Sequence, residues 1–311
     1  MLLYSGGLDS ILSYEVLRRA GVDVVPVKFH SIFCPEAKEE THLPEDEFVT
    51  ADVSADMVRL VKDPEHGLGK NVNPCMDCKQ MMYRRAWELA GDHGGEFIAT
   101  GEVVGQRPMS QRQDAFNAME SRADVQGMVV RPLCAQRLPP SIPEERGWVD
   151  RDQLLGFTGR DRNPQMRLAA EWGIEDYPAP AGGCRLTDPH FAERVRQLMD
   201  RDMFTTDNAS LIRNGRFFPL DGAFGVVGRD HEDNLCILQT ASEDALMLEL
   251  ESRPGPLAAL VGDRATEHIR HLKELVIRYS RFENLPTDAV VAVEPDEMRE
   301  RWVRRGAIEE K

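Results

Sequence analysis

The feature that most constrains this 311-residue chain is a glycine-rich turn at its very start. A short expected strand ends at Tyr4, the sequence Ser-Gly-Gly-Leu-Asp-Ser occupies residues 5–10, and apolar residues then recur at helical spacing as far as Gly21. Adjacent glycines let the backbone approach an anion closely, and the start of a helix offers free N–H groups and the positive end of its dipole. The order strand, glycine-rich turn, helix therefore predicts a phosphate cradle in an α/β fold.

Side chains within this turn suit a nucleotide phosphate. The hydroxyl groups of Ser5 and Ser10 can donate to phosphate oxygens, and the Asp9 carboxylate can face a Mg²⁺ ion that bridges them. The plain alternative is an ordinary strand–helix turn with a serine or aspartate cap. The turn is not a Walker A loop, because the Gly-x-x-x-x-Gly-Lys-Ser/Thr spacing is missing. A second strand over residues 22–29 completes a βαβ unit, which places Phe29 either beside a bound adenine or in the core.

Three of the six cysteines stand in sequence contexts that suit metal or sulfur chemistry. Cys75 and Cys78 form a Cys-x-x-Cys pair at the start of a helical stretch, where thiolates are favoured and one metal or cluster can be held. Cys184 follows two glycines within residues 180–185, where the backbone has the freedom to enter a crowded site. We interpret the others as small buried hydrophobic residues: Cys34, Cys134 and Cys236.

A further short strand is expected over residues 97–99, and it ends in Thr100-Gly101-Glu102. Strands of a parallel sheet present their carboxyl ends at one edge, and ligands bind at that edge. We therefore expect Thr100 and Gly101 to contact the nucleotide held by the glycine-rich turn. A turn without a binding role is the alternative.

Five motifs together resemble the tRNA thiolation enzymes of the PP-loop ATP-pyrophosphatase superfamily, in the order seen there: SGGLDS, NPCMDCK, IATGE, GQRPMSQ and PAPAGGCRLTD. NPC and the later GGC resemble the two cysteines of the tRNA 2-thiouridylases, and TGE-x-x-GQ resembles the 4-thiouridine synthetases. The added Cys78 makes a set like that of the iron–sulfur-dependent thiolases. The resemblance covers residues 1–190. The longer 4-thiouridine synthetases carry a ferredoxin-like and THUMP region before the loop, so substrate recognition in this chain is expected to come from elsewhere.

This resemblance implies a Rossmann-like parallel sheet of the adenine nucleotide alpha hydrolase type and an ATP-dependent tRNA sulfurtransferase. Such an enzyme adenylates a uridine carbonyl and replaces the oxygen with sulfur, giving 4-thiouridine or 2-thiouridine. It implies catalytic roles for Cys75, Cys184 and Asp9. The residues that it implies for binding ATP with Mg²⁺ are Ser5, Gly6, Gly7, Asp9, Ser10, Phe29, Thr100 and Gly101.

Two routes for the sulfur fit the cysteines. In one, Cys75, Cys78 and Cys184 hold a [4Fe–4S] cluster whose fourth iron is open to sulfide. In the other, Cys184 carries a persulfide and Cys75 resolves it as a disulfide. The sequence favours the cluster, since the second route leaves Cys78 without a role. The sulfur donor is expected to be sulfide or a persulfide relay from a cysteine desulfurase.

Charge bears on the tRNA partner. With 38 basic and 53 acidic residues the net charge is −15, which argues against a uniformly basic nucleic-acid binder. Arginines nevertheless cluster in the middle third, and a local groove for tRNA and a solvated face are equally good interpretations. The arginines we select as RNA contacts are Arg107, Arg160 and Arg162.

The pattern of residues changes near residue 200, which predicts a smaller α+β domain over residues 200–311 after a PP-loop domain over residues 1–190. Strands are expected over residues 209–220, 223–229 and 289–293, and helices over 189–202 and 265–280. The strings Gly215-Arg216-Phe217 and Arg278-Tyr279-Ser280 resemble the NFACT-R (DUF814-like) RNA-binding module. A small packing or dimerisation domain is the alternative.

Two rival functions remain from the sequence alone. A PP-loop ligase that forms amides would not need the three cysteines, and the intact SGGLDS argues against a non-catalytic RNA-binding protein. There is no run of about 18 apolar residues and no signal-peptide pattern, so we expect a cytoplasmic protein that does not enter a membrane. A homodimer is one assembly that the sequence allows. Whether Met1 is the native start stays open.

Overall fold

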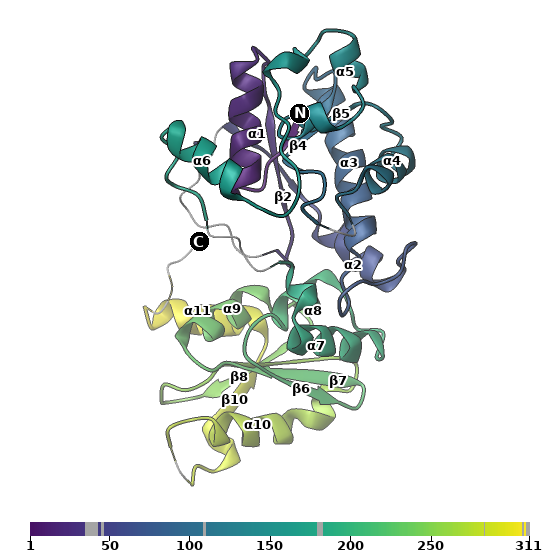
Figure 1. Ribbon diagram of the computed structural model, residues 1–311. Helices are drawn as coiled ribbons and strands as arrows, with labels where there is room; N and C mark the ends of the chain where they lie inside the picture. The colour runs from purple at the N-terminus through teal and green to yellow at the C-terminus, as the bar shows by residue number, and fades with distance from the viewer. Residues whose placement is uncertain are drawn as a thin grey trace. The chain divides into compact units, whose positions relative to one another are not determined.

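The structure is a computed structural model that describes residues 1–34, 43–44, 47–107, 110–178, 183–282, 284–306 and 308. The chain divides into two compact units, Met1–Arg185 and Leu186–Lys311. Each unit is built on its own five-stranded sheet with helices against both faces, as Figure 1 shows. Within the described residues, no helix is long and apolar enough to cross a membrane.

The sheet of the first unit is entirely parallel, with strand order β3-β2-β1-β4-β5. Its strands are β1 (Leu2–Leu3), β2 (Pro26–His30), β3 (Val49–Asp52), β4 (Ile98–Thr100) and β5 (Val129–Val130). The chain runs outward from β1 to β3 and then returns to β4 on the other side of β1. Strand order therefore reverses between β1 and β4, and open α/β sheets bind ligands in the crevice at that point.

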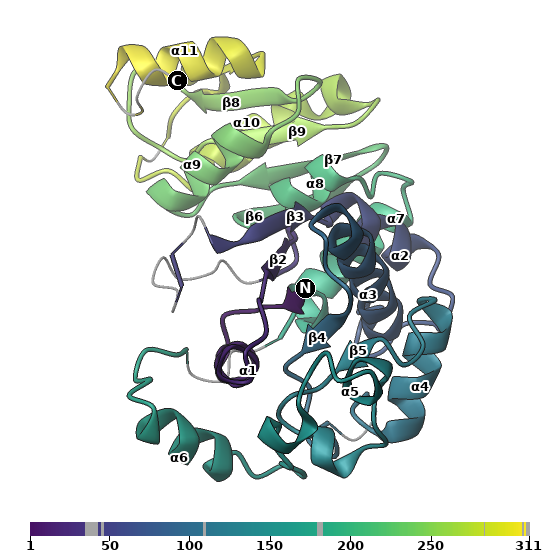
Figure 2. The same ribbon diagram turned by 90° about the horizontal axis from the view of Figure 1, so that it is seen from above.

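Side chains of the central strands alternate between two cores. Leu2 and Ala99 face the core beside α1 (Leu8–Arg19), whereas Val27 and Ile98 face the core beside α3 (Cys75–Asp92). Figures 1 and 2 show α1 and α6 (Asn163–Glu171) on one face of the sheet and α3 with α4 (Gln113–Arg122) on the other. Each leucine or isoleucine buried in this way stabilises the fold by about 1.5–3 kcal/mol.

The sequence predicted the central elements of this unit better than their ends. The strand expected from residue 22 begins only at Pro26, and α3 already begins at Cys75, so both cysteines of the pair lie within the helix. The remaining described elements of the unit are short: α2 (Ser54–Lys62), η2 (Ala135–Arg137), α5 (Ile142–Glu145), η3 (Arg151–Gln153) and η4 (Arg185–Thr187), the last of which begins at the end of the unit.

The second unit is an antiparallel sheet with strand order β10-β8-β9-β7-β6. Apolar side chains of α10 pack against one face, and α9 and α11 lie on the other (Figure 1). Its strands are β6 (Arg216–Leu220), β7 (Ala223–Val227), β8 (Leu246–Leu250), β9 (Ala258–Val261) and β10 (Val290–Val293). Its helices are α7 (Pro189–Met199), α8 (Thr206–Leu211), α9 (His231–Thr240), η5 (Ala265–His268), α10 (Ile269–Arg278), η6 (Thr287–Ala289) and α11 (Pro295–Arg304).

Comparison with the sequence analysis gives one confirmation and one correction. The α/β class, with a parallel sheet followed by a smaller α+β unit, is confirmed. The long strand expected from residue 209 is wrong, because Ala209 lies in α8 and the strand begins at Arg216. The Thr205 side chain accepts a hydrogen bond from the Asn208 N–H at 3.2 Å, and this helix cap favours α8 over an extended strand.

Candidate active site

The glycine-rich turn after β1, residues 5–10, forms a compact loop at the first turn of α1. We call it the phosphate loop after the role that the sequence predicts for it. Gly6 has a φ of +73°, a left-handed conformation that glycine adopts without strain, and Gly7 caps the helix. The hydroxyl of Ser10 is buried and donates to the Gly7 carbonyl at 2.8 Å, while the backbone N–H of Ser5 donates to the Ser10 oxygen at 3.3 Å. Ser10 therefore holds the loop in shape, and Ser5 is the exposed serine of the pair.

The end of β4 rests directly on this loop through Gly101. A Cβ atom at Gly101 would lie 2.9 Å from the carbonyl carbon and oxygen of Asp9, so only glycine permits the approach. Thr100, in contrast, is 3% exposed and donates its hydroxyl to Glu102 at 3.3 Å. The structure thus brings Gly101 to the phosphate loop, whereas the Thr100 side chain is directed to a buried carboxylate.

Asp9 has one carboxylate oxygen that is bound twice and one that is free. Arg162 and Gln106 both reach Oδ2, with nitrogen–oxygen distances of 2.7 Å and 2.9 Å. Among the described residues, no group hydrogen-bonds to the buried Oδ1 of Asp9, nor to the buried side-chain oxygens of Gln106 and Gln111. Buried polar atoms in proteins nearly always have a partner. Gln106 donates to Asp9, so the open oxygens of these two residues lie close together and mark a place for a cation or for donor groups of a ligand.

Two loops that are distant in sequence bring Gln106 and Arg162 to Asp9. The Gly159 N–H donates to the Val104 carbonyl at 2.9 Å, and a Cβ at Gly105 would lie 3.2 Å from the Gly159 nitrogen. The loop after β4 therefore packs tightly against the loop before α6, and Arg162 stands at the N-terminal end of that helix. Residues 108–109 of the same loop lie outside the described residues.

The other predicted contacts to nucleotide and RNA are more dispersed. Phe29 is half-buried and packs against the core on the α3 side of the sheet. Arg107 and Arg160 are exposed, whereas the side chain of Arg162 is 32% exposed and is engaged by Asp9. Arg162 consequently differs from the two arginines with which the sequence analysis had grouped it.

The three predicted cysteines come together. Cys75 is exposed at the first residue of α3, while Cys78, one turn later, and Cys184 are half-buried. The pKa of the Cys78 thiol is raised to about 12, first by burial and then by the neighbouring thiols of Cys184, Cys75 and Cys34. The residues before Gly183 in the predicted Pro-Ala-Gly-Gly-Cys turn, residues 180–182, lie outside the described part of the chain.

The interpretation of Cys34 as a buried hydrophobic residue is wrong. Its side chain is exposed, and it is one of the thiols that influence Cys78. The sequence analysis missed it because no second cysteine or glycine-rich turn accompanies it in the chain. Cys134 is buried as expected, and Cys236 is half-buried in the second unit.

A buried ion network links the cysteine helix to the end of β4. Lys79, which follows Cys78, places its ammonium nitrogen 2.5 Å from Glu102, and Arg131 approaches the same carboxylate at 3.3 Å. Burial alone would raise the pKa of Glu102, but Lys79 and Arg131 outweigh burial and hold that pKa below its ordinary value. We call this the ion network; its members are Lys79, Tyr83, Glu102, Glu120 and Arg131.

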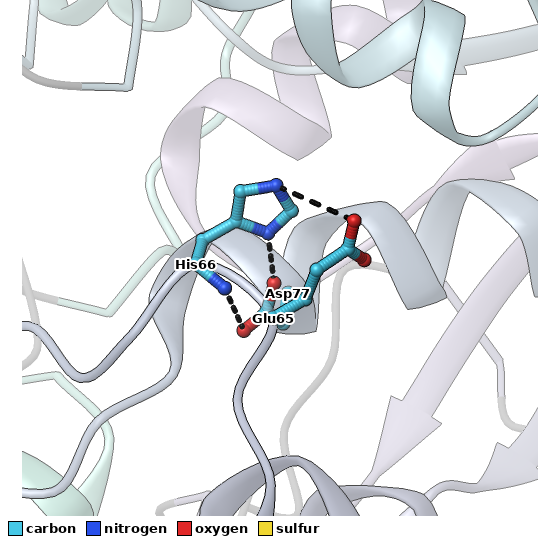
Figure 3. A group of neighbouring side chains, drawn as sticks. All are labelled: Glu65, His66 and Asp77. Atoms are coloured by element: carbon cyan, nitrogen blue, oxygen red, sulfur yellow. Dashed lines mark hydrogen bonds and ion pairs between the residues drawn. The ribbon is translucent and has the colours of Figure 1, made fainter.

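A second polar group fixes the turn that carries the cysteines, as Figure 3 shows. Asp77 lies between the two cysteines of α3 with its side chain 3% exposed; it accepts from the backbone N–H of His66 at 3.3 Å and also contacts the His66 ring. Glu65, 3.9 Å from the other ring nitrogen, is 68% exposed. In the described residues this is the one group that brings three metal-ligating atoms within 4.8 Å of one another, so the thiols as placed are too widely spaced for a single shared ion.

Known proteins resemble the first unit. Residues 1–137 match the family model described as Thiamine biosynthesis protein (ThiI). The matched segment is less than half of the chain. A protein of Methanosarcina acetivorans described as "Probable tRNA sulfurtransferase" is 29% identical over 119 residues, which is 34% of this chain and 28% of that protein. The chain thus spans less than a third of that relative's length.

A solved structure also aligns with the chain. The crystal structure of a "predicted subunit of tRNA methyltransferase" from Methanocaldococcus jannaschii is 17% identical, with a TM-score of 0.31. The alignment covers 67% of this chain and 90% of that one. The glycine-rich turn, the Cys-x-x-Cys pair and the Thr-Gly-Glu sequence all fall within the matched residues 1–137, whereas Arg162 and Cys184 follow them in the chain.

Proposed function

We propose that this protein is an ATP-dependent tRNA sulfurtransferase that adenylates a uridine carbonyl and replaces its oxygen with sulfur. The observation that carries the proposal is the phosphate loop with an open Asp9 oxygen in the same unit as a set of converging thiols. Neither half suffices, because the loop alone would suit an amide-forming ligase and the thiols alone a redox protein. The description of the Methanosarcina acetivorans relative supports tRNA as the substrate class.

The activation step uses the phosphate loop. The uracil carbonyl oxygen attacks the α-phosphorus of ATP, and pyrophosphate leaves. Ser5, the backbone of Gly6 and Gly7, and the N-terminus of α1 would hold the pyrophosphate. Mg²⁺, when bound, neutralises phosphate charge, and the free Oδ1 of Asp9 fits such a cation. Arg162, fixed on Asp9, would add positive charge beside the leaving group.

The sulfur step uses the cysteines. A sulfur nucleophile attacks the activated carbon, and AMP leaves with the former carbonyl oxygen. Cys75, Cys78 and Cys184 would hold a [4Fe–4S] cluster, a role supported by the influence of the Cys75 and Cys184 thiols on the Cys78 thiol. The cluster, when bound, supplies an iron to which a sulfur donor can bind. The persulfide route, with Cys184 as carrier and Cys75 as resolving thiol, is the alternative for this step.

Substrate binding would extend beyond this unit. We assign tRNA phosphate contacts to the exposed Arg107 and Arg160, and an RNA-binding role to the second unit, residues 200–311 in the sequence-based division. In that unit the Arg216 guanidinium lies 4.4 Å from the centre of the Tyr279 ring, an aromatic and basic pair of the kind that RNA-binding surfaces use. A cytoplasmic location and a homodimer remain part of the proposal.

A release assay tests the activation step. Pyrophosphate is measured in the presence of ATP, with and without bulk tRNA, for the parent and for Asp9→Ala. We expect tRNA-dependent release by the parent and none by the variant. Release that depends on a small amine or acid instead of tRNA would indicate a ligase. Release by Asp9→Ala at the parental rate would contradict the assignment of the phosphate loop.

Iron analysis tests the sulfur step. Protein purified without oxygen is expected to contain about four irons per chain. Cys75→Ala, Cys78→Ala and Cys184→Ala should each lose iron and tRNA thiolation together, while Cys236→Ala, a half-buried cysteine of the second unit, serves as the matched control. Full thiolation by an iron-free parent protein would sink the cluster and leave the persulfide route.

A further inference from the structure

Cys34 lies in a hydrogen-bonded turn after β2. The backbone N–H of Cys34 donates to the Ser31 carbonyl at 2.9 Å, and the neighbouring N–H of Phe33 donates to the Ser31 hydroxyl at 3.2 Å. The Phe33 side chain is fully buried, and the N–H of Ile32 is bound by the Ser54 hydroxyl at 3.1 Å. The backbone at Cys34 is therefore held by hydrogen bonds and by the buried Phe33 side chain.

This turn lies directly beside the segment that carries Cys184. The backbone N–H of Arg185 donates to the Phe33 carbonyl at 2.9 Å. Each hydrogen-bonded residue is the immediate chain neighbour of a cysteine, so Cys34 and Cys184 stand on adjacent stretches of backbone. A hydrogen bond of this kind joins segments that are about 5 Å apart.

The four cysteines concerned come from three separate segments. Cys75 and Cys78 come from α3, Cys184 from the end of the unit, and Cys34 from the turn after β2. Cys34, Cys75 and Cys184 all raise the pKa of the Cys78 thiol, as neighbouring groups of the same charge type do. The cubane cluster has four irons and takes one thiolate on each.

We infer that Cys34 is the fourth ligand of the cluster that Cys75, Cys78 and Cys184 would hold. The inference rests on the cluster part of the proposed function. It changes the expectation that one iron stands open, because Cys34 would close that position in the resting protein. Its thiolate would have to leave the iron and take up a proton before a sulfur donor could bind there. Cys34 is exposed, as Cys75 is, and its turn belongs to neither of the other two segments, so it could leave the iron without displacing the other three cysteines.

The test compares the full-length parent protein with Cys34→Ala and with Cys236→Ala as the matched control. All three are purified and reconstituted with iron and sulfide without oxygen, and an equimolar amount of ferricyanide is then added. Ferricyanide removes a single electron from [4Fe–4S]²⁺, and the resulting [4Fe–4S]³⁺ can release Fe²⁺ to become [3Fe–4S]⁺. An iron without a protein thiolate is the one released.

We expect Cys34→Ala to fall from about four to about three irons per chain and to develop the electron paramagnetic resonance signal of [3Fe–4S]⁺, while the parent and Cys236→Ala keep their iron. Equal iron loss by parent and Cys34→Ala would overturn the inference and leave the three-cysteine cluster intact. A Cys34–Cys184 disulfide in the reconstituted parent, found by mass spectrometry of unreduced peptides, would also overturn it. A parent without iron that still releases pyrophosphate would refute the cluster but not the activation step.

Discussion

Two polar clusters lie close together in the first unit, and they differ in how many of their buried oxygens have a hydrogen-bond partner. In the ion network, Oε1 of Glu102 accepts from Lys79, and its Oε2 accepts from Tyr83, Thr100 and Arg131. At the phosphate loop, in contrast, Asp9 Oδ1 and the side-chain oxygen of Gln106 have no protein partner among the described residues. A closed cluster stabilises a fold, whereas an open one is left for a ligand. The comparison separates two kinds of polar residue that look alike in the sequence.

The largest effect should come from breaking the closed cluster. Glu102→Gln leaves Lys79 and Arg131 buried without their shared counter-charge, and the loss of one member of a buried ion pair costs about 3–5 kcal/mol of unfolding free energy. Urea unfolding followed by circular dichroism measures this change. Glu88→Gln is the matched control, since Glu88 forms a half-exposed ion pair with Arg85 and its loss should cost less than about 1 kcal/mol. Equal effects from the two variants would show that the network does not stabilise the unit.

The open cluster should respond in the opposite way. Asp9→Asn keeps the shape of the side chain but removes the charge that would face a cation, so we expect unfolding free energy to change little. Pyrophosphate formation should fall by about a hundredfold or more, as for the loss of other preorganised electrostatic contacts. The two measurements are made on the same protein preparation. If Asp9→Asn lowers the unfolding free energy but leaves the rate of pyrophosphate formation unchanged, Asp9 has a stabilising role like that of the ion network.

Acid should distinguish the clusters by a smaller effect. The pKa of Glu102 is lower in the folded protein than its ordinary value of 4.5, because Lys79 and Arg131 outweigh its burial. Its contribution to stability is therefore fully present above that ordinary value and is lost as the pH falls through the folded pKa. The thermal unfolding temperature of the parent should fall steeply as the pH drops below about 4.5. For Glu102→Gln, the unfolding temperature should depend less steeply on pH. An identical pH dependence of the unfolding temperature in the two proteins would show that Glu102 does not cause the loss of stability in acid.

The smallest effect should come from the exposed arginines. Arg160→Ala should weaken tRNA binding and reduce its salt dependence by about one phosphate contact, with pyrophosphate release at saturating tRNA unchanged. Arg162→Ala, two residues away, should reduce pyrophosphate release and leave the salt dependence as it was, because Arg162 is bound to Asp9. Nitrocellulose-filter binding at several salt concentrations and the release assay together separate the pair. Identical behaviour of the two variants would return Arg162 to the RNA surface.

The sequence predicted those features of the fold and the candidate site that depend on residues close together in the chain. The glycine-rich turn, the Cys-x-x-Cys pair and the parallel sheet follow from residues that are neighbours in the chain, and they were anticipated. Three features were not: the contact of Arg162 with Asp9, the ion network, and the place of Cys34 beside Cys184. Each depends on how loops far apart in sequence pack together, as Asp9 and Arg162 do across 153 positions. The residues around Cys34 in the chain do not indicate this neighbour, because a backbone hydrogen bond between Phe33 and Arg185, far apart in the sequence, joins the two segments.

The fit of Gly101 against Asp9 also has a mechanical meaning. No side chain separates the first turn of α1 from the end of β4, and Glu102, the next residue, is fastened through Lys79 to the helix that carries Cys75 and Cys78. The phosphate loop and the cysteine pair are thus joined by two residues of backbone and one buried ion pair, with no hinge along that path. This connection is short and tightly packed. A nucleotide and a sulfur centre bound at its two ends, as we propose, would therefore keep a constant spacing while the RNA moves.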